Sequence, residues 1–261
     1  MEKISFISTH FYDFDWTQKL IHQITQLTPA KFIFEILIIN QDRNKNSRLQ
    51  LETLDKKIRV VEYPISEKHF LVQGHDHAFV LNQVILEAKG DYLIIFDSDA
   101  HPFKKNWLPI CENILSDYEA ILAEDPINPY LSHPCFMLFP RNFINYNLEF
   151  DKDLFTGKMD TGRLIGEQLQ KQNRKIFYAK QKPAFNGHWG SIYLESIYHH
   201  GNGSFLGGDN RLLIQVRKSC KYFKKYVIKM NKYELTFIEE IEFLILSKLN
   251  RLFKGFFSIP N

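Results

Sequence analysis

The stretch Gly90-Asp91-Tyr92-Leu93-Ile94-Ile95-Phe96-Asp97-Ser98-Asp99 decides the fold class of this chain. The apolar run from Tyr92 to Phe96 predicts a short buried strand. It ends on two carboxylates, Asp97 and Asp99, which point the same way in extended backbone because one residue separates them. Two converging carboxylates favour a hard divalent cation such as Mg²⁺ or Mn²⁺. At the carboxyl end of a buried strand they also lie where open α/β sheets bind ligands.

Helices and strands alternate on both sides of this stretch. Apolar residues from Ala78 to Lys89 recur at helical spacing, and Gly90 supplies a C-terminal stop. Strands are predicted at 4–8, 34–39, 58–63, 92–96, 120–123, 135–139 and 175–179, and helices at 17–27, 78–89, 106–117 and 161–173. This alternation predicts an α/β fold with a mostly parallel sheet flanked by helices. Residues 1–210 are expected to form this domain, and 211–261 a basic and apolar helical appendage.

The residues around the paired carboxylates resemble the GT-A fold of nucleotide-sugar glycosyltransferases, especially the large family two of inverting enzymes. The matching residues are Ala78, Leu81-Asn82, Ala88-Lys89-Gly90-Asp91-Tyr92, Asp97-Ser98-Asp99, Pro102 and Trp107-Leu108. The resemblance implies metal-dependent transfer of a sugar, with inversion, from a nucleotide-diphosphate sugar donor to a glycan, polysaccharide or lipid-linked acceptor hydroxyl. Processive members carry a Gln-x-x-Arg-Trp-type motif and membrane helices, and neither is visible here, so we expect one sugar per encounter.

The resemblance also assigns roles to the central motif. It implies that Asp97 contacts the ribose and helps to position a Mn²⁺ or Mg²⁺ ion, which Asp99 ligates directly. Ser98 and Asn82, which match the same motif, are assigned to donor binding. The alternative is that both aspartates only cap the following helix.

The ends of the first two strands should form the nucleotide pocket. The candidates are Thr9 after the first strand and Asn40 after the second, with Asp42 nearby. Asn40 stands where the family usually has Asp, although an amide can still pair with a pyrimidine edge. Ordinary loop chemistry is the alternative explanation for Asn40.

Asp160 is the leading candidate for the general base that deprotonates the acceptor. The family places a Glu-Asp pair at a similar position, but Met159 stands here in place of the Glu. Asp151 and Asp153 are lesser candidates. The alternative for Asp160 is an N-cap of the helix that follows, since Asp is favoured at such positions.

His199 and His200 are candidates for a further metal or diphosphate ligand, because GT-A enzymes often supply a late histidine. Adjacent residues on a strand face opposite ways, so only one of the two should reach the site. A structural role for both is the alternative. His75 and His77 also share a face, but a two-histidine zinc site there lacks obvious further ligands.

Composition indicates the cellular compartment and the partners to expect. Three scattered cysteines show no metal-ligand spacing, and the N-terminus has no signal-peptide layout, so we expect reduced thiols and a cytoplasmic protein. A net charge of +3 gives no argument for a nucleic-acid partner. The appendage carries a run of cations interleaved with aromatic residues: Arg217, Lys218, Lys221, Lys224, Lys225, Lys229 and Lys232.

A basic amphipathic tail of this kind is typical of peripheral contact with a membrane surface, here its inner face. The alternative is that its helices pack on the catalytic domain or on a second copy in a homo-oligomer. Two rival functions also stay open. A nucleotidyltransferase uses paired Asp and a metal too, but His10-Phe11-Tyr12-Asp13 is not its Gly-rich phosphate loop. A degenerate, non-catalytic binding domain is disfavoured by the intact Asp97, Asp99 and Asp160.

Overall fold

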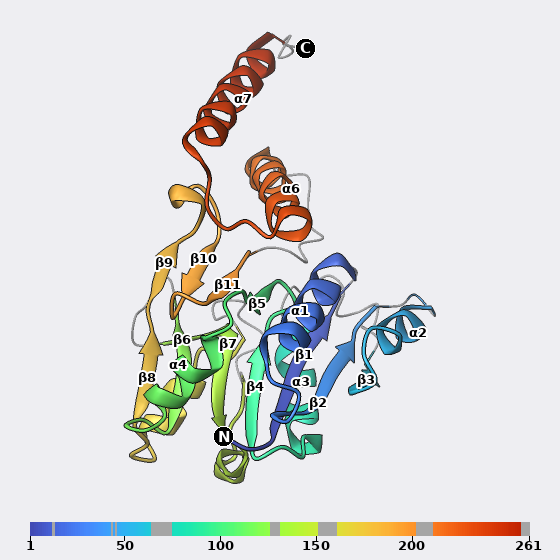
Figure 1. The fold of residues 1–261 in the computed structure, drawn as a ribbon, viewed down its shortest axis with the longest axis vertical. Coiled ribbons are helices and arrows are strands. Elements are labelled where there is room, and N and C mark those ends of the chain that lie inside the picture. Colours follow the sequence, from blue (N-terminus) through green and yellow to red (C-terminus); the bar gives the residue numbers. More distant parts are fainter. Residues whose placement is uncertain are drawn as a thin grey trace.

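The chain folds around a seven-stranded sheet with the strand order β3-β2-β1-β4-β7-β6-β8 (Figure 1). The computed structural model describes residues 1–11, 14–42, 44, 46–63, 75–125, 131–150, 161–201 and 211–256. The strands are β1 (Ile4–His10), β2 (Ile33–Asn40), β3 (Ile58–Glu62), β4 (Tyr92–Phe96), β6 (Ala120–Glu124), β7 (Ser132–Pro140) and β8 (Ile176–Ala179). The first four strands in this order are parallel to one another, so the carboxyl ends of β1, β2, β3 and β4 lie at one edge of the sheet.

Strand β7 is antiparallel to both of its neighbours, β4 and β6. Phe136 pairs with Phe96, the last residue of β4, so the residues that precede Phe136 lie beyond the carboxyl end of β4. The start of β7 therefore lies at the same edge of the sheet as the motif that follows β4.

Helices cover both faces of the sheet. They are α1 (Phe14–Leu27), α2 (Ser47–Glu52), α3 (His75–Glu87), α4 (Trp107–Ile114) and α5 (Ile165–Gln170), with short 3₁₀ turns at Arg141–Tyr146 and Phe185–Gly187. Apolar residues of α1, α2 and α4 join one buried cluster, and those of α3 and α5 join another. Because both faces are covered, side chains on both sides of the inner strands are buried; all seven residues of β1 are buried, although four of them are polar.

A second, four-stranded antiparallel sheet stands at the carboxyl edge of the first. It has the order β5-β11-β10-β9 and consists of β5 (Ala100–Pro102), β9 (Gln181–Pro183), β10 (Ser191–Tyr193) and β11 (Ile197–His199). Strand β5 begins directly after Asp99, and its first residue, Ala100, pairs with His199. This small sheet therefore connects residues that are a hundred positions apart in the sequence.

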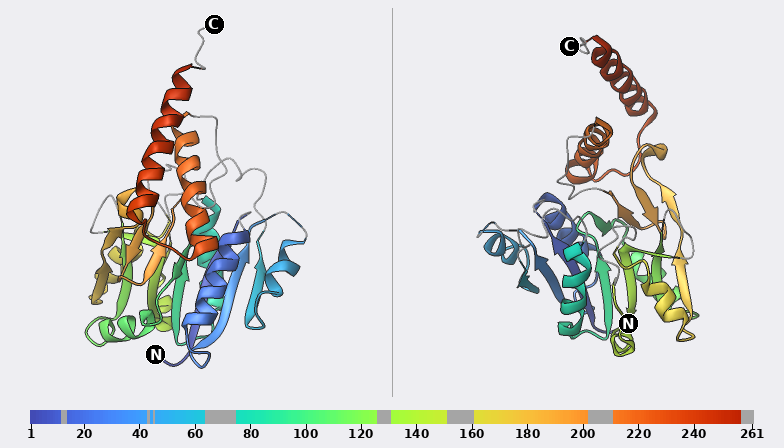
Figure 2. Two further views of the ribbon diagram at one scale, coloured as in Figure 1. Left: turned by 45° about the horizontal axis from the view of Figure 1, so that its top comes forward. Right: turned by 180° about the vertical axis from the view of Figure 1, so that it is seen from behind.

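The C-terminal helices α6 (Arg211–Met230) and α7 (Phe237–Phe256) lie at the end of the molecule opposite the N-terminus (Figure 2). Phe223, Tyr226 and Val227 of α6 join a third buried cluster with Trp16 of α1 and Tyr198 of β11. Helix α7 extends away from the sheet and exposes apolar side chains. No helix among the described residues is both long and apolar enough to cross a bilayer.

The predicted fold class is confirmed: the molecule is α/β, its central sheet is mostly parallel, and helices form the C-terminal appendage. The predicted strand at 92–96 coincides with β4. The helix predicted at 161–173 is shorter, because residues 161–164 form turns before α5 begins. The second sheet was not predicted, since strands of three residues carry no readable alternation.

Candidate functional site

Three side chains that could hold a metal ion converge at the carboxyl end of β4. Asp97 and Asp99 follow that strand, and His199 ends β11. His199 Nε2 lies 3.8 Å from Asp97 Oδ2 and 3.6 Å from Asp99 Oδ1. One ligand atom from each of the three residues lies within 4.8 Å of the other two. Two carboxylates and an imidazole are a donor set that suits Mg²⁺ or Mn²⁺.

Backbone hydrogen bonds fix this turn. The Asp97 N–H donates to the Cys135 carbonyl at 3.4 Å, and the Ala100 N–H donates to the Asp97 carbonyl at 3.0 Å. The Asp99 carbonyl accepts a hydrogen bond from the His200 N–H at 3.0 Å. The turn is thus tied to β7 on one side and to β11 on the other, so both carboxylates are held without help from a helix cap. The following helix, α4, has Asn106 at its N-cap position.

The two adjacent histidines lie in different surroundings, as expected for neighbours on a strand. His200 is buried, its Nδ1 lies 2.7 Å from the Tyr198 hydroxyl, and its ring centroid is 4.5 Å from that of Trp16. The structure therefore brings His199 to the carboxylates and packs His200 against Trp16 and Tyr198.

His77 joins the site although sequence reasoning considered it only as half of a zinc pair. Its Nε2 lies 3.8 Å from Asp97 Oδ1 and 3.4 Å from Thr9 Oγ1. Helix α3 connects two parallel strands, so it begins at their carboxyl edge and its first turn lies near Asp97. That topological rule is the signal that could have identified His77.

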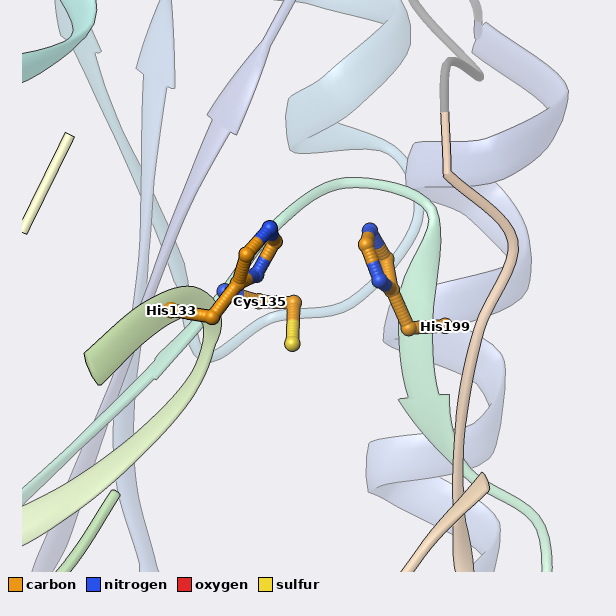
Figure 3. Close-up of side chains that lie close together, drawn as sticks. All are labelled: His133, Cys135 and His199. Atoms are coloured by element: carbon orange, nitrogen blue, oxygen red, sulfur yellow. The ribbon is translucent and has the colours of Figure 1, made fainter. Parts of the chain in front are cut away.

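A second group of ligands shares His199. His133, Cys135 and His199 each offer one ligand atom within 4.8 Å of the other two. The ring centroids of His133 and His199 are 5.1 Å apart, and Figure 3 shows Cys135 between them. The cysteines have no metal-ligand spacing along the chain, but folding gives Cys135 two histidine neighbours. An irregularity in the pairing of β6 with β7, between His133 and Met137, brings His133 and Cys135 to the same group, and no local pattern in the sequence signals it.

Tyr193 contacts this group through Cys135. Its hydroxyl hydrogen-bonds the Cys135 side chain, and burial, reinforced by Cys135 and then by Asp97, raises the pKa of Tyr193. The phenol therefore stays protonated and acts as a hydrogen-bond donor to the sulfur.

The three candidates for the nucleotide pocket lie at the ends of β1 and β2. Thr9 contacts His77, as described above. The Asn40 amide donates to the Glu62 carboxylate at 3.1 and 3.3 Å, and its oxygen accepts the Asp42 N–H at 3.2 Å. Asp42 in turn accepts a 2.6 Å hydrogen bond from the Ser47 hydroxyl. Asn40 thus makes the contacts that ordinary loop chemistry, its alternative explanation, requires, and Asp42 belongs to the same hydrogen-bonded loop.

Asn82 and Ser98 are the other two residues assigned to donor binding. The Asn82 side-chain oxygen accepts the Phe150 N–H at 2.9 Å, so Asn82 positions the chain just before residue 151. Ser98 is buried between the two aspartates. Neither placement changes their assignment to donor binding, which stays a prediction.

Asp160, Asp151 and Asp153 lie outside the described residues. The helix that follows, α5, begins at Ile165 and has Leu164 at its N-cap position. The segment that follows residue 160 is anchored at the site. The Ser132 hydroxyl donates to the Gly162 carbonyl at 2.6 Å, and Arg163 Nε lies 2.9 Å from Asp125 Oδ2.

No protein-family model matches this sequence, and no curated protein matches it. Solved structures match it by fold. The mannosyltransferase PcManGT from Pyrobaculum calidifontis, in complex with GDP-Man and Mn²⁺, aligns with a TM-score of 0.53 and 13% identity over 69% of this chain and 55% of that one. S. aureus TarS aligns with a TM-score of 0.52 and 12% identity over 67% of this chain and 35% of that one. Residues 1–349 of S. aureus TarS align with a TM-score of 0.54 and 12% identity over 86% of this chain and 72% of that one.

These comparisons show the fold. The chain has the fold of glycosyltransferases, as the residues around Asp97 and Asp99 predict. It spans about half the length of PcManGT and about a third of TarS.

Proposed function

We propose that this protein is a glycosyltransferase that moves a sugar from a nucleotide-diphosphate sugar to an acceptor hydroxyl with the help of Mn²⁺ or Mg²⁺. One observation carries the proposal: Asp97, Asp99 and His199 converge at the carboxyl end of β4. This edge belongs to a fold shared with a mannosyltransferase that was solved with a nucleotide sugar and Mn²⁺.

The residues have separate tasks in this scheme. Asp97, Asp99 and His199 would hold the ion, whose positive charge stabilises the departing diphosphate as a Lewis acid. His77 lies against Asp97 and would fix the orientation of that carboxylate. Without a cation, the two carboxylates would repel a diphosphate.

The donor would extend from Asp97 toward the ends of β1 and β2. Thr9, Ser98 and Asn82 would border its nucleotide, while Asn40 and Asp42 shape the loop beside it through the hydrogen bonds to Glu62 and Ser47. Asp42 also lies 3.9 Å from His10 Nε2, which connects this loop to the end of β1.

Asp160 is the proposed general base, and it would remove the acceptor hydroxyl proton while the hydroxyl attacks the sugar. Direct attack by the acceptor inverts the anomeric carbon, as in the family that the sequence resembles. The anchoring of Gly162 to β7 supports this assignment, because β7 begins beside the metal ligands. Asp160→Asn should lower turnover much more than it weakens donor binding, since a base acts on the acceptor and not on the nucleotide.

We also propose that the C-terminal helices bring the enzyme to a membrane surface that presents a lipid-linked acceptor. The support is the exposed apolar stripe of Phe237, Ile241 and Ile245, which lie on one side of α7.

The test of the function is a donor screen. Nucleotide sugars are added one at a time with Mn²⁺ and the melting temperature is recorded, because a ligand that binds the native state raises it. Donors that stabilise the protein are then assayed for nucleoside diphosphate release, and NMR of the product reports the anomeric configuration. Failure of every nucleotide sugar to bind or to be cleaved, with the protein folded and Mn²⁺ present, would overturn the proposal.

A further inference from the structure

We propose that His133, Cys135 and His199 form a second metal site, suited to Zn²⁺, that competes with the carboxylate site for His199. The metal-binding part of this inference stands on geometry alone. Only its consequence for sugar transfer rests on the proposed function.

The geometry comes from three segments that the fold brings together. β7 begins where β4 ends, and the Cys135 carbonyl accepts the Asp97 N–H, so the two groups of ligands share one hydrogen-bonded frame. His133 and Cys135 lie at an irregular part of β7, where the Cys135 N–H hydrogen-bonds the His133 ring and both side chains reach the same group. His199 approaches them from β11, whose pairing with β5 fixes its position.

Hydrogen bonds hold both new ligands beside each other. His133 Nδ1 accepts the Cys135 N–H at 3.2 Å, so in the neutral ring the lone pair is on Nδ1 and faces Cys135. A bound ion would take this lone pair in place of the hydrogen bond. Cys135 is fully buried, and the hydroxyl of Tyr193 hydrogen-bonds its side chain. Such a donor stabilises a thiolate, which is the form of cysteine that binds metal.

Ligand chemistry distinguishes the two groups. Asp97, Asp99 and His199 offer mainly oxygen, which suits Mn²⁺ and Mg²⁺, whereas one thiolate and two imidazoles suit Zn²⁺. A tetrahedral zinc ion holds ligand atoms about 3.4–3.8 Å apart, given bond lengths of about 2.0–2.3 Å. The present ligand atoms lie within 4.8 Å of one another, so side-chain rotations that move these atoms by about 1 Å would bring them to the separations that zinc requires.

His199 belongs to both groups of ligands. Its Nε2 now lies 3.6 Å from Asp99 and 3.8 Å from Asp97, while its ring stands 5.1 Å from that of His133. An imidazole that turns toward Cys135 to bind zinc moves away from the carboxylates. Zinc should therefore weaken Mn²⁺ binding, and through it inhibit sugar transfer.

The experiment uses Co²⁺ as a spectroscopic substitute for Zn²⁺ on the full chain. We expect a thiolate-to-cobalt charge-transfer band that Zn²⁺ removes at one equivalent. Cys135→Ser should abolish the band, and His133→Ala should weaken Zn²⁺ binding about 100-fold, measured against a chromophoric chelator. Cys111→Ala is the matched control, because Cys111 is a buried cysteine of α4 that does not belong to this group of ligands. It should keep the band.

Two further results complete the test. Asp99→Asn should weaken Mn²⁺ binding but leave the cobalt band intact. One equivalent of Zn²⁺ should lower the affinity for Mn²⁺, followed by electron paramagnetic resonance, about tenfold. A band that is absent, or that persists in Cys135→Ser protein whose melting curve is normal, overturns the zinc site. An unchanged affinity for Mn²⁺ overturns the sharing of His199. Neither readout requires sugar transfer, so failure of the proposed function would be recognised separately.

Discussion

At the scale of single residues, His199 and His200 show how the alternation of a strand assigns neighbouring side chains to different tasks. His199 points to two carboxylates, whereas His200 packs against Trp16 and hydrogen-bonds the Tyr198 hydroxyl. The sequence predicts that only one of them reaches the site, but it does not say which, because the face depends on how β11 pairs with β5.

We therefore predict opposite effects for the two histidines. His199→Ala should weaken Mn²⁺ binding by about tenfold or more while the melting temperature of the metal-free protein changes little. His200→Ala should lower that temperature, because a buried ring leaves a cavity that costs about 2–4 kcal/mol. Titration calorimetry and thermal denaturation measure the two quantities. Equal loss of metal affinity in both variants would contradict the assignment.

Asp99→Asn should nearly abolish turnover and leave the fold intact, since the amide keeps the shape of the side chain but loses its charge. The expected loss is on the order of 10²-fold or more, as for one strong electrostatic contact in a transition state. Asp117→Asn is the matched control, because Asp117 is exposed at the end of the turn that follows α4. Near-normal turnover of Asp99→Asn with a suitable donor would remove Asp99 from the metal site.

The limits of sequence reasoning are clear at this scale. Asp97 and Asp99 were found because their spacing is local and their strand is strongly apolar. His77 and Cys135 were not, because their proximity to Asp97 and His199 depends on helix direction and sheet register. Asn40 was found, but its bond to Glu62 arises from the pairing of β2 with β3, which no local pattern reveals.

At the scale of elements, the second sheet does most to build the site. Its strands β5 and β11 have three residues each, and their pairing places His199 beside Asp99. The long strands and helices of the first sheet were predictable from period and composition. Short strands that are stabilised by their partners cannot be predicted in this way. The strand that supplies the third ligand, His199, is therefore seen only in the structure.

The start of α7 offers a test at this scale. Thr236 and Glu239 form a capping box: the Glu239 carboxylate accepts the Thr236 N–H at 2.9 Å, and the Glu239 N–H donates to the Thr236 hydroxyl at 3.4 Å. Lys232 Nζ lies 2.9 Å from the same carboxylate. The bond from the Thr236 backbone, then those from the Lys232 and Thr236 side chains, lower the pKa of Glu239 to about 2.

Glu239→Ala should therefore increase amide exchange in the first turns of α7 about fivefold, as expected for a cap that contributes about 1 kcal/mol. Because the folded pKa lies below the ordinary value of 4.5, the carboxylate stabilises the cap fully above that pH and loses its effect as pH falls toward about 2. Glu242→Ala, at an exposed position, is the control, measured by exchange with mass spectrometry. Equal protection in both variants would contradict the capping role.

At the scale of the whole molecule, the two C-terminal helices behave differently. α6 packs on α1 through Phe223, Tyr226 and Val227, as the packing alternative expects. Two of the cations predicted to face an anionic surface are paired within the protein instead: Lys224 with Asp15 at 3.0 Å and Lys232 with Glu239 at 2.9 Å. α7 keeps an exposed apolar stripe, so any membrane contact depends mainly on this helix.

Truncation after residue 236 should reduce flotation with anionic vesicles and leave nucleotide binding measurable, because every buried residue of the third cluster precedes α7, which adds only the partly buried Phe243 to it. Ile241→Glu in the full chain is a second variant that interrupts the stripe without removing the helix. Intact protein that ignores vesicles at physiological salt, or that sediments as a dimer only while α7 is present, would favour a second copy as the partner of this helix.

The central claim is that Asp97, Asp99 and His199 hold a divalent ion against the diphosphate of a nucleotide donor. Titration calorimetry of the full chain with nucleoside diphosphates, once with Mn²⁺ and once with EDTA, tests it most directly. The account predicts binding at least about tenfold tighter with Mn²⁺, a difference of about 1.4 kcal/mol that disappears in Asp99→Asn. Equal affinity in EDTA and in Mn²⁺ would contradict it.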